Sequence, residues 1–282
     1  MTDESTQIKR DDIRAVDLFT SFVAFFMLSA VFTQIFGFKE SISGWKIIFI
    51  MGINYFPLLL FPFLIASKYH DVGKILGLSR ENFIKTAPYG IAAFLIAGTW
   101  QTGILGFSDI TQYPDWVAYV NPLAVLIILL LPLLEMKYIR GKWIIPGFIT
   151  LIVWAIYAYM LPSGDEEMSQ AVMDACLNPW MFVLISFLMG IFVPFAEEYF
   201  FRGFVLRGFL GNFSPYVAIL ITGTLFGFAH FGMTSVITLA LFSLPIGLFT
   251  WHTKSIYPAI WAHAGLNLSG MVFLLIQMQL PG

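Results

Sequence analysis

The sequence is poor in charged residues. Of its 282 residues only 11% are Asp, Glu, Lys or Arg, and the formal net charge is −2. A soluble globular domain carries about 25% of these residues, so the composition argues against a large soluble core. The small net charge does not indicate any class of partner, and we expect no nucleic acid.

Cysteine is almost absent as well. Cys176 is the only one in the sequence, so no internal disulfide can form and no cysteine-based metal cluster is available. The N-terminal stretch MTDESTQIKRDDIRAVD also lacks the basic patch and short apolar run of a cleaved signal peptide. We therefore expect residues 1–16 to remain as a short cytoplasmic tail.

Hydrophobic residues are abundant, at 59% of the chain. They gather in runs that approach or exceed the roughly 18 to 20 residues needed to cross a bilayer. These runs lie at about 17–36, 47–67, 87–107, 117–136, 143–161, 180–201, 215–231, 233–250 and 257–278. The pattern predicts an all-α, polytopic bundle of eight or nine transmembrane helices that form a single membrane domain.

Positive charge predicts the orientation of this bundle, because Lys and Arg accumulate on the cytoplasmic side of short loops. With the N-terminus inside and nine crossings, 13 of the 15 basic residues face the cytoplasm, and only Lys39 and Lys46 face outward. The acidic loop at 162–180 then lies on the outer face. We expect a multi-pass protein of the plasma membrane, with residues 17–170 forming the N-terminal helices and 180–280 the core.

Three charges interrupt the late apolar run in 195-FAEEYFFRGF-204. An ionisable side chain deep in a membrane helix costs roughly 2.5 to 3.5 kcal/mol on insertion scales, so its presence indicates function. Residues four apart share a helix face, so Glu198 can pair with Arg202. Glu197 lies on another face and remains available for chemistry.

A second polar cluster is 226-FGFAH-230, in which Phe226 and His230 share a helix face. Gly223 and Gly227, also four apart, allow another helix to approach closely. We expect all of these residues to lie within one apolar helix.

A third cluster is 263-HAGLN-267. His263 and Asn267 are four apart, so both can point toward one place in the bundle. The remaining histidines, His70 and His252, fall in predicted loops.

These side chains suit the hydrolysis of an amide bond. A carboxylate and an imidazole that converge can hold and deprotonate a water molecule, and a desolvated carboxylate is the stronger base. Glu197 with His230 fits that role. His263 and Asn267 can supply two donors to the developing oxyanion, where loss of one donor typically costs about 10²- to 10³-fold in rate. No serine or cysteine lies in a nucleophile motif, so a covalent intermediate is not indicated.

The order E-E-x-x-x-R, F-x-x-x-H, H-x-x-x-N on successive late helices resembles the CPBP family, which includes CAAX prenyl endopeptidases and bacteriocin-processing or immunity proteins. The matching residues are Glu197, Glu198 and Arg202, then Phe226 and His230, then His263 and Asn267. The resemblance covers about residues 180–280, and the earlier helices match only as preceding apolar segments.

The resemblance implies an intramembrane glutamate-dependent endopeptidase with no cofactor. In it Glu197 and His230 activate water, His263 and Asn267 form the oxyanion hole, and Glu198, Arg202 and Phe226 support the geometry. The implied partners are the lipid bilayer and a peptide or membrane-associated protein, lipidated or not. We expect the site to open toward the cytoplasm.

Three alternatives remain open at the level of sequence. Glu197, His230 and His263 could bind zinc with a water in the fourth position, although no H-E-x-x-H pair places ligands on one helix. A non-catalytic immunity or scaffold protein could use the same residues to bind a partner. A transporter could use them as a proton relay, although no inverted repeat is visible.

Overall fold

Every regular element in the part of the chain that the structure describes is a helix. The structure is a computed structural model, and it describes residues 44–68, 72–108, 172–230 and 233–279 together with a few positions between 17 and 28. The α-helices are α3 (Gly44–Ala66), α4 (Val72–Leu76), α5 (Asn82–Lys85), α6 (Ala87–Ser108), α10 (Pro179–Phe187), α11 (Val193–Glu198), α12 (Leu206–Leu210), α13 (Pro215–Phe228), α14 (Met233–Thr253) and α15 (Tyr257–Gln279). Two π-helical segments, η2 (Leu188–Phe192) and η3 (Tyr199–Val205), lie between α10 and α12. These elements confirm the all-α fold class for the described residues.

Three of the described helices are long and apolar enough to cross a membrane: Gly44–Ala66, Pro179–Leu210 and Tyr257–Ile276. Shorter apolar helices cover Ala87–Gly98 and Pro215–Phe228. The predicted runs at 117–136 and 143–161 lie outside the described residues. The count of eight or nine crossings therefore stays a prediction.

The helical run that carries the two glutamates begins at a well-formed cap. The Asn178 side chain accepts hydrogen bonds from the backbone N–H groups of Trp180 and Met181, at 3.0 and 3.3 Å. Pro179 occupies the first turn, where a missing N–H costs nothing. The run then passes through η2, α11, η3 and α12 without a break. Glu197 and Glu198 thus lie between two π segments, which in helices are often found at functional sites.

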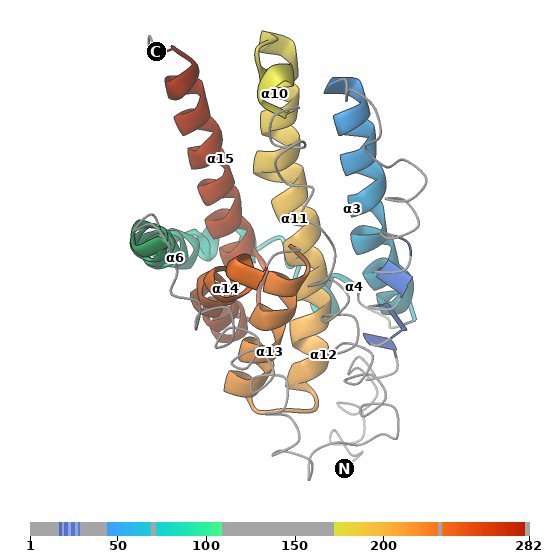
Figure 1. The fold of residues 1–282 in the computed structure, drawn as a ribbon. Coiled ribbons are helices and arrows are strands. Elements are labelled where there is room, and N and C mark those ends of the chain that lie inside the picture. Colours follow the sequence, from blue (N-terminus) through green and yellow to red (C-terminus); the bar gives the residue numbers. More distant parts are fainter. Residues whose placement is uncertain are drawn as a thin grey trace, which may run out of the picture.

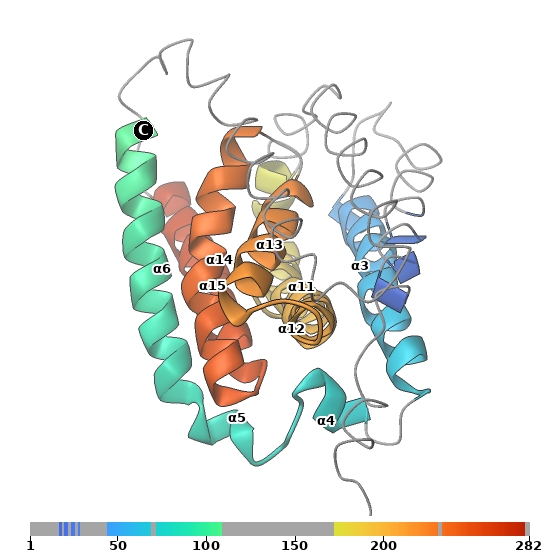
Figure 2. The same ribbon diagram turned by 90° about the horizontal axis from the view of Figure 1, so that it is seen from below.

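This continuous run, Pro179–Leu210, is called the glutamate helix below, and it lies between α3 and α15. Figure 1 shows α3, α11 and α15 side by side, with α11 in the middle. The helices α6 and α14 run across this direction, so they are seen close to end-on in Figure 1 and lengthwise in Figure 2. α14 packs against both α13 and α6, and α6 also packs against α15. Polar side chains on α11, α15 and the end of α13 are thereby brought to the middle of the bundle.

The close helix approach predicted at Gly223 is present. A Cβ atom on Gly223 would lie 3.1 Å from Ser243 Oγ and 3.2 Å from the carbonyl oxygen of Ala240. Both partners belong to α14, so the missing side chain allows α13 and α14 to pack closely.

Two histidines differ from the prediction. α13 ends at Phe228, and His230 lies in the following turn, where its backbone N–H bonds to the carbonyl of Gly227 three residues back. This tighter bond ends the helix. His252, expected in a loop, lies in the last turn of α14, because the helix continues to Thr253 and stops where Lys254 adopts a φ of 53°.

Candidate active site

Glu198 and Arg202 form a fully buried ion pair, both with a side-chain exposure of 0%. Arg202 Nη1 donates to Glu198 Oε1 at 3.0 Å, and Arg202 Nε lies 3.0 Å from Oε2. Nη2 of the same guanidinium donates to Ser243 Oγ on α14. The pairing that the four-residue spacing predicted is therefore present, with a hydrogen bond at Oε1 and a close ionic contact at Oε2.

The ring of Phe226 lies against this ion pair. The Arg202 guanidinium carbon is 4.6 Å from the ring centroid, a distance at which the cation is attracted to the face of the ring. The rings of His230 and His263 lie 4.6 and 5.7 Å from the same centroid. Phe226 thus packs against one charged and two imidazole side chains from three separate elements.

His263 contacts both glutamates. Its Nδ1 lies 2.8 Å from Glu198 Oε1, and because an ionised carboxylate only accepts hydrogen bonds, Nδ1 carries the proton. Its Nε2 then faces Glu197 Oε2 at 3.8 Å. The bond from Nδ1 to Glu198 sets the orientation of the imidazole ring. The sequence did not predict this bond.

His230 is held in a similar way by a backbone group. Its Nδ1 lies 2.8 Å from the carbonyl oxygen of Phe226, so Nδ1 again carries the proton. Nε2 is 3.7 Å from Glu197 Oε2. The His230 side chain is 32% exposed, whereas that of Glu197 is 6% exposed, so His230 lies on the more open side of the cluster.

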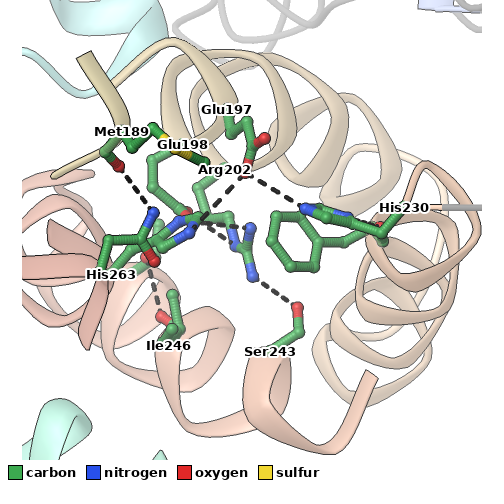
Figure 3. A network of polar contacts seen from close by, with 11 residues as sticks. Met189, Glu197, Glu198, Arg202, His230, Ser243, Ile246 and His263 are labelled. Atoms are coloured by element: carbon green, nitrogen blue, oxygen red, sulfur yellow. Dashed lines mark hydrogen bonds and ion pairs between the residues drawn. The ribbon is translucent and has the colours of Figure 1, made fainter. Parts of the chain in front are cut away.

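Glu197 Oε2 is the point at which the site converges (Figure 3). It is buried and has no hydrogen-bond partner among the described residues. The Nε2 atoms of two histidines face it at 3.7 and 3.8 Å. These separations are too long for direct hydrogen bonds and are of the kind that a shared water molecule bridges. The structure therefore brings three of the four predicted catalytic side chains together.

Asn267, the fourth, lies one turn beyond His263 on α15. Its Nδ2 donates to the carbonyl oxygen of Met189 in η2 at 2.8 Å. Only one of the two amide hydrogens is used in this bond. The site residues thus come from the glutamate helix, α15 and the turn after α13.

One family model matches the part of the chain that carries these residues. Residues 179–269 match the family model described as Type II CAAX prenyl endopeptidase Rce1-like. We refer to this matched segment as the Rce1-like region because it is similar to that family. The match confirms the resemblance indicated by the three motifs and contains all of them. It covers about a third of the chain, and comparison with curated proteins and with solved structures gave no match.

Two residues at the site were missed by sequence reasoning. Tyr55 on α3, outside the Rce1-like region, lies close enough to Glu197 for its hydroxyl to interact with that carboxylate. Ser243 on α14 accepts from Arg202. Asn54 and Tyr55 interrupt the apolar run at 47–67, and this polar pair is the signal that could have identified Tyr55. A lone serine in an apolar helix gives no comparable signal.

The distances from Glu197 to the two histidines can be compared with those in a tetrahedral zinc site. Three ligands about 2.1 Å from a tetrahedral zinc ion lie roughly 3.4 Å apart, and both distances from Glu197 Oε2 to the imidazole nitrogens are longer, at 3.7 and 3.8 Å. Within the described ranges, no group of three or more His, Cys, Asp or Glu side chains is arranged to hold a metal ion. Zinc-dependent and metal-free hydrolysis differ in their sensitivity to a chelator.

Proposed function

We propose that the protein is an intramembrane endopeptidase that hydrolyses a peptide bond in a membrane-associated or lipidated protein or peptide. The observation that carries the proposal is the buried, unpaired Oε2 of Glu197 facing the Nε2 atoms of His230 and His263. The match of residues 179–269 to the Rce1-like family supports the same reaction class.

In the proposed reaction, Glu197 and His230 hold a water molecule between them. Glu197 Oε2 accepts a proton from this water as the oxygen attacks the peptide carbonyl. A tetrahedral intermediate with a negative oxygen results. The C–N bond then breaks, and the proton passes from Glu197 to the leaving amine, which restores the carboxylate.

His263 and Asn267 are proposed to donate hydrogen bonds to the negative oxygen of the intermediate. The Nδ1 proton of His263 is directed to Glu198, so Nε2 can donate only while the imidazole carries both protons. Asn267 has one amide hydrogen on Met189 and can use its second. Both side chains are thus held in orientation by bonds to other groups before substrate binds, which is what preorganised stabilisation requires.

Glu198 and Arg202 are proposed to position His263 and to take no part in proton transfer. Both oxygens of Glu198 contact Arg202, and Oε1 also accepts from His263. A fully buried guanidinium needs its counter-ion, so the pair is a fixed support for the imidazole ring. Phe226 packs on Arg202 and on both histidines and completes that support.

We further propose that the protein is a multi-pass protein of the plasma membrane, with its N-terminus and the opening of the site on the cytoplasmic side. The positive-inside distribution of Lys and Arg supports this orientation. Three described helices are long and apolar enough to span a bilayer.

The test uses the purified full-length protein in detergent and two peptides of the same sequence, one prenylated at a cysteine near its C-terminus and one not. We expect hydrolysis of the prenylated peptide, detected by mass spectrometry, to persist at full rate in 1,10-phenanthroline. Loss of activity in the chelator and recovery with added zinc would support the zinc protease instead. Specific binding of the prenylated peptide without hydrolysis would support a non-catalytic role and contradict the proposal.

A further inference from the structure

Pro194 lies in the glutamate helix three residues before Glu197 and two residues after the end of the π segment η2. The residue before it, Val193, donates its backbone N–H to the carbonyl of Leu188, five residues back. In this register the next donor along the chain would serve the carbonyl of Met189. That donor would be residue 194, and proline has no N–H. The Met189 carbonyl therefore has no backbone N–H donor five residues ahead of it, where the π-helical pattern would supply one.

A side chain from another helix occupies this carbonyl. Asn267 Nδ2 on α15 donates to Met189 O at 2.8 Å. This hydrogen bond is part-buried, and a backbone carbonyl away from water needs a partner, so the amide of Asn267 replaces the missing N–H of Pro194. The missing N–H of Pro194 and the amide of Asn267 thus concern the same acceptor, the Met189 carbonyl, although they belong to different helices.

The next residue on each helix shows that the contact is built by close packing. A Cβ atom on Gly190 would lie 2.4 Å from Leu268 Cδ2. Gly190 follows Met189, and Leu268 follows Asn267, so the absent side chain at 190 allows α15 to approach η2 at this point. A larger residue at 190 would push against the helix that carries both His263 and Asn267.

We propose that Pro194 is a positioning residue. Because it has no N–H, it leaves the Met189 carbonyl available to Asn267, and the resulting hydrogen bond fixes the direction of the Asn267 amide. The bond to Met189 uses one amide hydrogen and defines which end of the carboxamide is nitrogen. The second hydrogen is then held in one direction, where it serves the oxyanion. This last step rests on the proposed function, whereas the link between Pro194, Met189 and Asn267 does not.

The link is tested by a double-mutant cycle on Tm in detergent, with Asn267→Ala, Pro194→Ala and the double variant. With Pro194 present, Asn267→Ala leaves Met189 O unpaired, and we expect Tm to fall by about 2 to 4 °C or more. With alanine at 194, a backbone N–H can reach Met189 O, so Asn267→Ala should cost less than half as much. An equal loss of Tm in both backgrounds would overturn the inference.

Two further variants make this cycle specific. Pro194→Leu restores the N–H with a different side chain and should weaken the effect of Asn267→Ala in the same way, and it also serves if Pro194→Ala does not fold. Pro62→Ala restores an N–H inside α3, away from Met189, and should leave the effect of Asn267→Ala on Tm unchanged. If Pro62→Ala weakened that effect equally, the coupling would not belong to Pro194.

Peptide hydrolysis provides the second readout. Asn267→Ala should lower kcat by about 10²- to 10³-fold. Pro194→Ala should lower kcat with little change in KM, and the double variant should be no slower than Asn267→Ala alone. Independent, multiplying losses would mean that Pro194 acts by another route. A wild-type protein without hydrolysis would count against the proposed function only, because the Tm cycle needs no turnover.

Discussion

At the scale of single residues, two neighbouring glutamates have different surroundings. Helical geometry turns successive residues by about 100°, so Glu198 faces Arg202 and His263 while Glu197 faces His230. Both oxygens of Glu198 contact the Arg202 guanidinium, and Oε1 also accepts from His263. Oε2 of Glu197 instead faces two imidazole nitrogens, at 3.7 and 3.8 Å. In the proposed mechanism the same residue type is thus a support in one position and the general base in the next.

The first prediction concerns Glu198→Ala. This change leaves the Arg202 guanidinium fully buried without its counter-ion, and loss of one partner of such a pair costs about 3 to 5 kcal/mol. We expect a clear fall in Tm, measured by thermal unfolding in detergent, together with loss of hydrolysis because His263 is no longer held. An inactive Glu198→Ala protein with unchanged Tm would mean that the two glutamates have exchanged roles.

Sequence spacing predicted part of this site and could not predict the rest. The pairing of Glu198 with Arg202 follows from their separation by four residues, since both lie on one helix. The contact of Asn267 with Met189 depends on a backbone carbonyl freed by a π turn and a proline, and side-chain patterns do not record that register. The end of α13 before His230 was missed for a similar reason, because a run of apolar residues continues past the last helical bond.

At the scale of helices, α3 contributes to a site whose recognisable motifs all lie elsewhere. The second prediction is that Tyr55→Phe lowers kcat by about tenfold, since it removes the hydroxyl that interacts with the Glu197 carboxylate, and one hydrogen bond contributes about 1 to 1.5 kcal/mol. Steady-state hydrolysis by the purified variant measures this. Tyr216→Phe is the matched control, because Tyr216 lies on α13 and is 72% exposed. Equal kcat values for wild type and Tyr55→Phe would contradict a role for α3 in the chemistry.

The segment after α4 shows how helix ends are joined around the core. Gly77 has a φ of +75°, and its carbonyl accepts from Ile256 N–H at 3.3 Å. Arg207 passes close to it and donates from Nη2 to the Lys254 carbonyl at 2.7 Å. Gly77 therefore allows α4, α12 and the turn before α15 to meet.

The third prediction is that Gly77→Ala destabilises the protein by roughly 1 to 3 kcal/mol, measured as a fall in Tm. The new Cβ would lie 2.2 Å from Arg207 Nη2, and alanine rarely adopts a positive φ. Gly52→Ala in α3 is the control, since a Cβ at Gly52 has no neighbour within 4 Å and alanine favours the helix. A Tm loss as large in the control would refute the steric explanation.

At the scale of the whole molecule, the Rce1-like region packs against helices outside it. α6 packs against α15 and α14, and α3 packs against α11 and η3. The fourth prediction is that a fragment of residues 172–282 does not yield a monodisperse, active protein in detergent, because the faces of α15 and the glutamate helix lose their partners. Size-exclusion chromatography and peptide hydrolysis measure this, and a stable active fragment would contradict a single membrane domain.

The apolar runs predicted where most described helices lie, because a bilayer requires long hydrophobic segments. They did not predict that α6 and α14 would run across α3, α11 and α15 (Figures 1 and 2). Hydrophobicity reports burial in an apolar environment, and it does not report the direction of a helix. The number of crossings also depends on segments outside the described residues.

The central claim is that Glu197 activates the water that cleaves the peptide. Its most direct test is single-turnover hydrolysis by Glu197→Gln, with Tm as the measure of folding. The amide keeps the shape of the side chain and cannot accept the proton, so we predict a Tm within about 2 °C of wild type and a loss of cleavage of at least about 10³-fold. Cleavage by Glu197→Gln at a rate comparable to wild type would contradict the account.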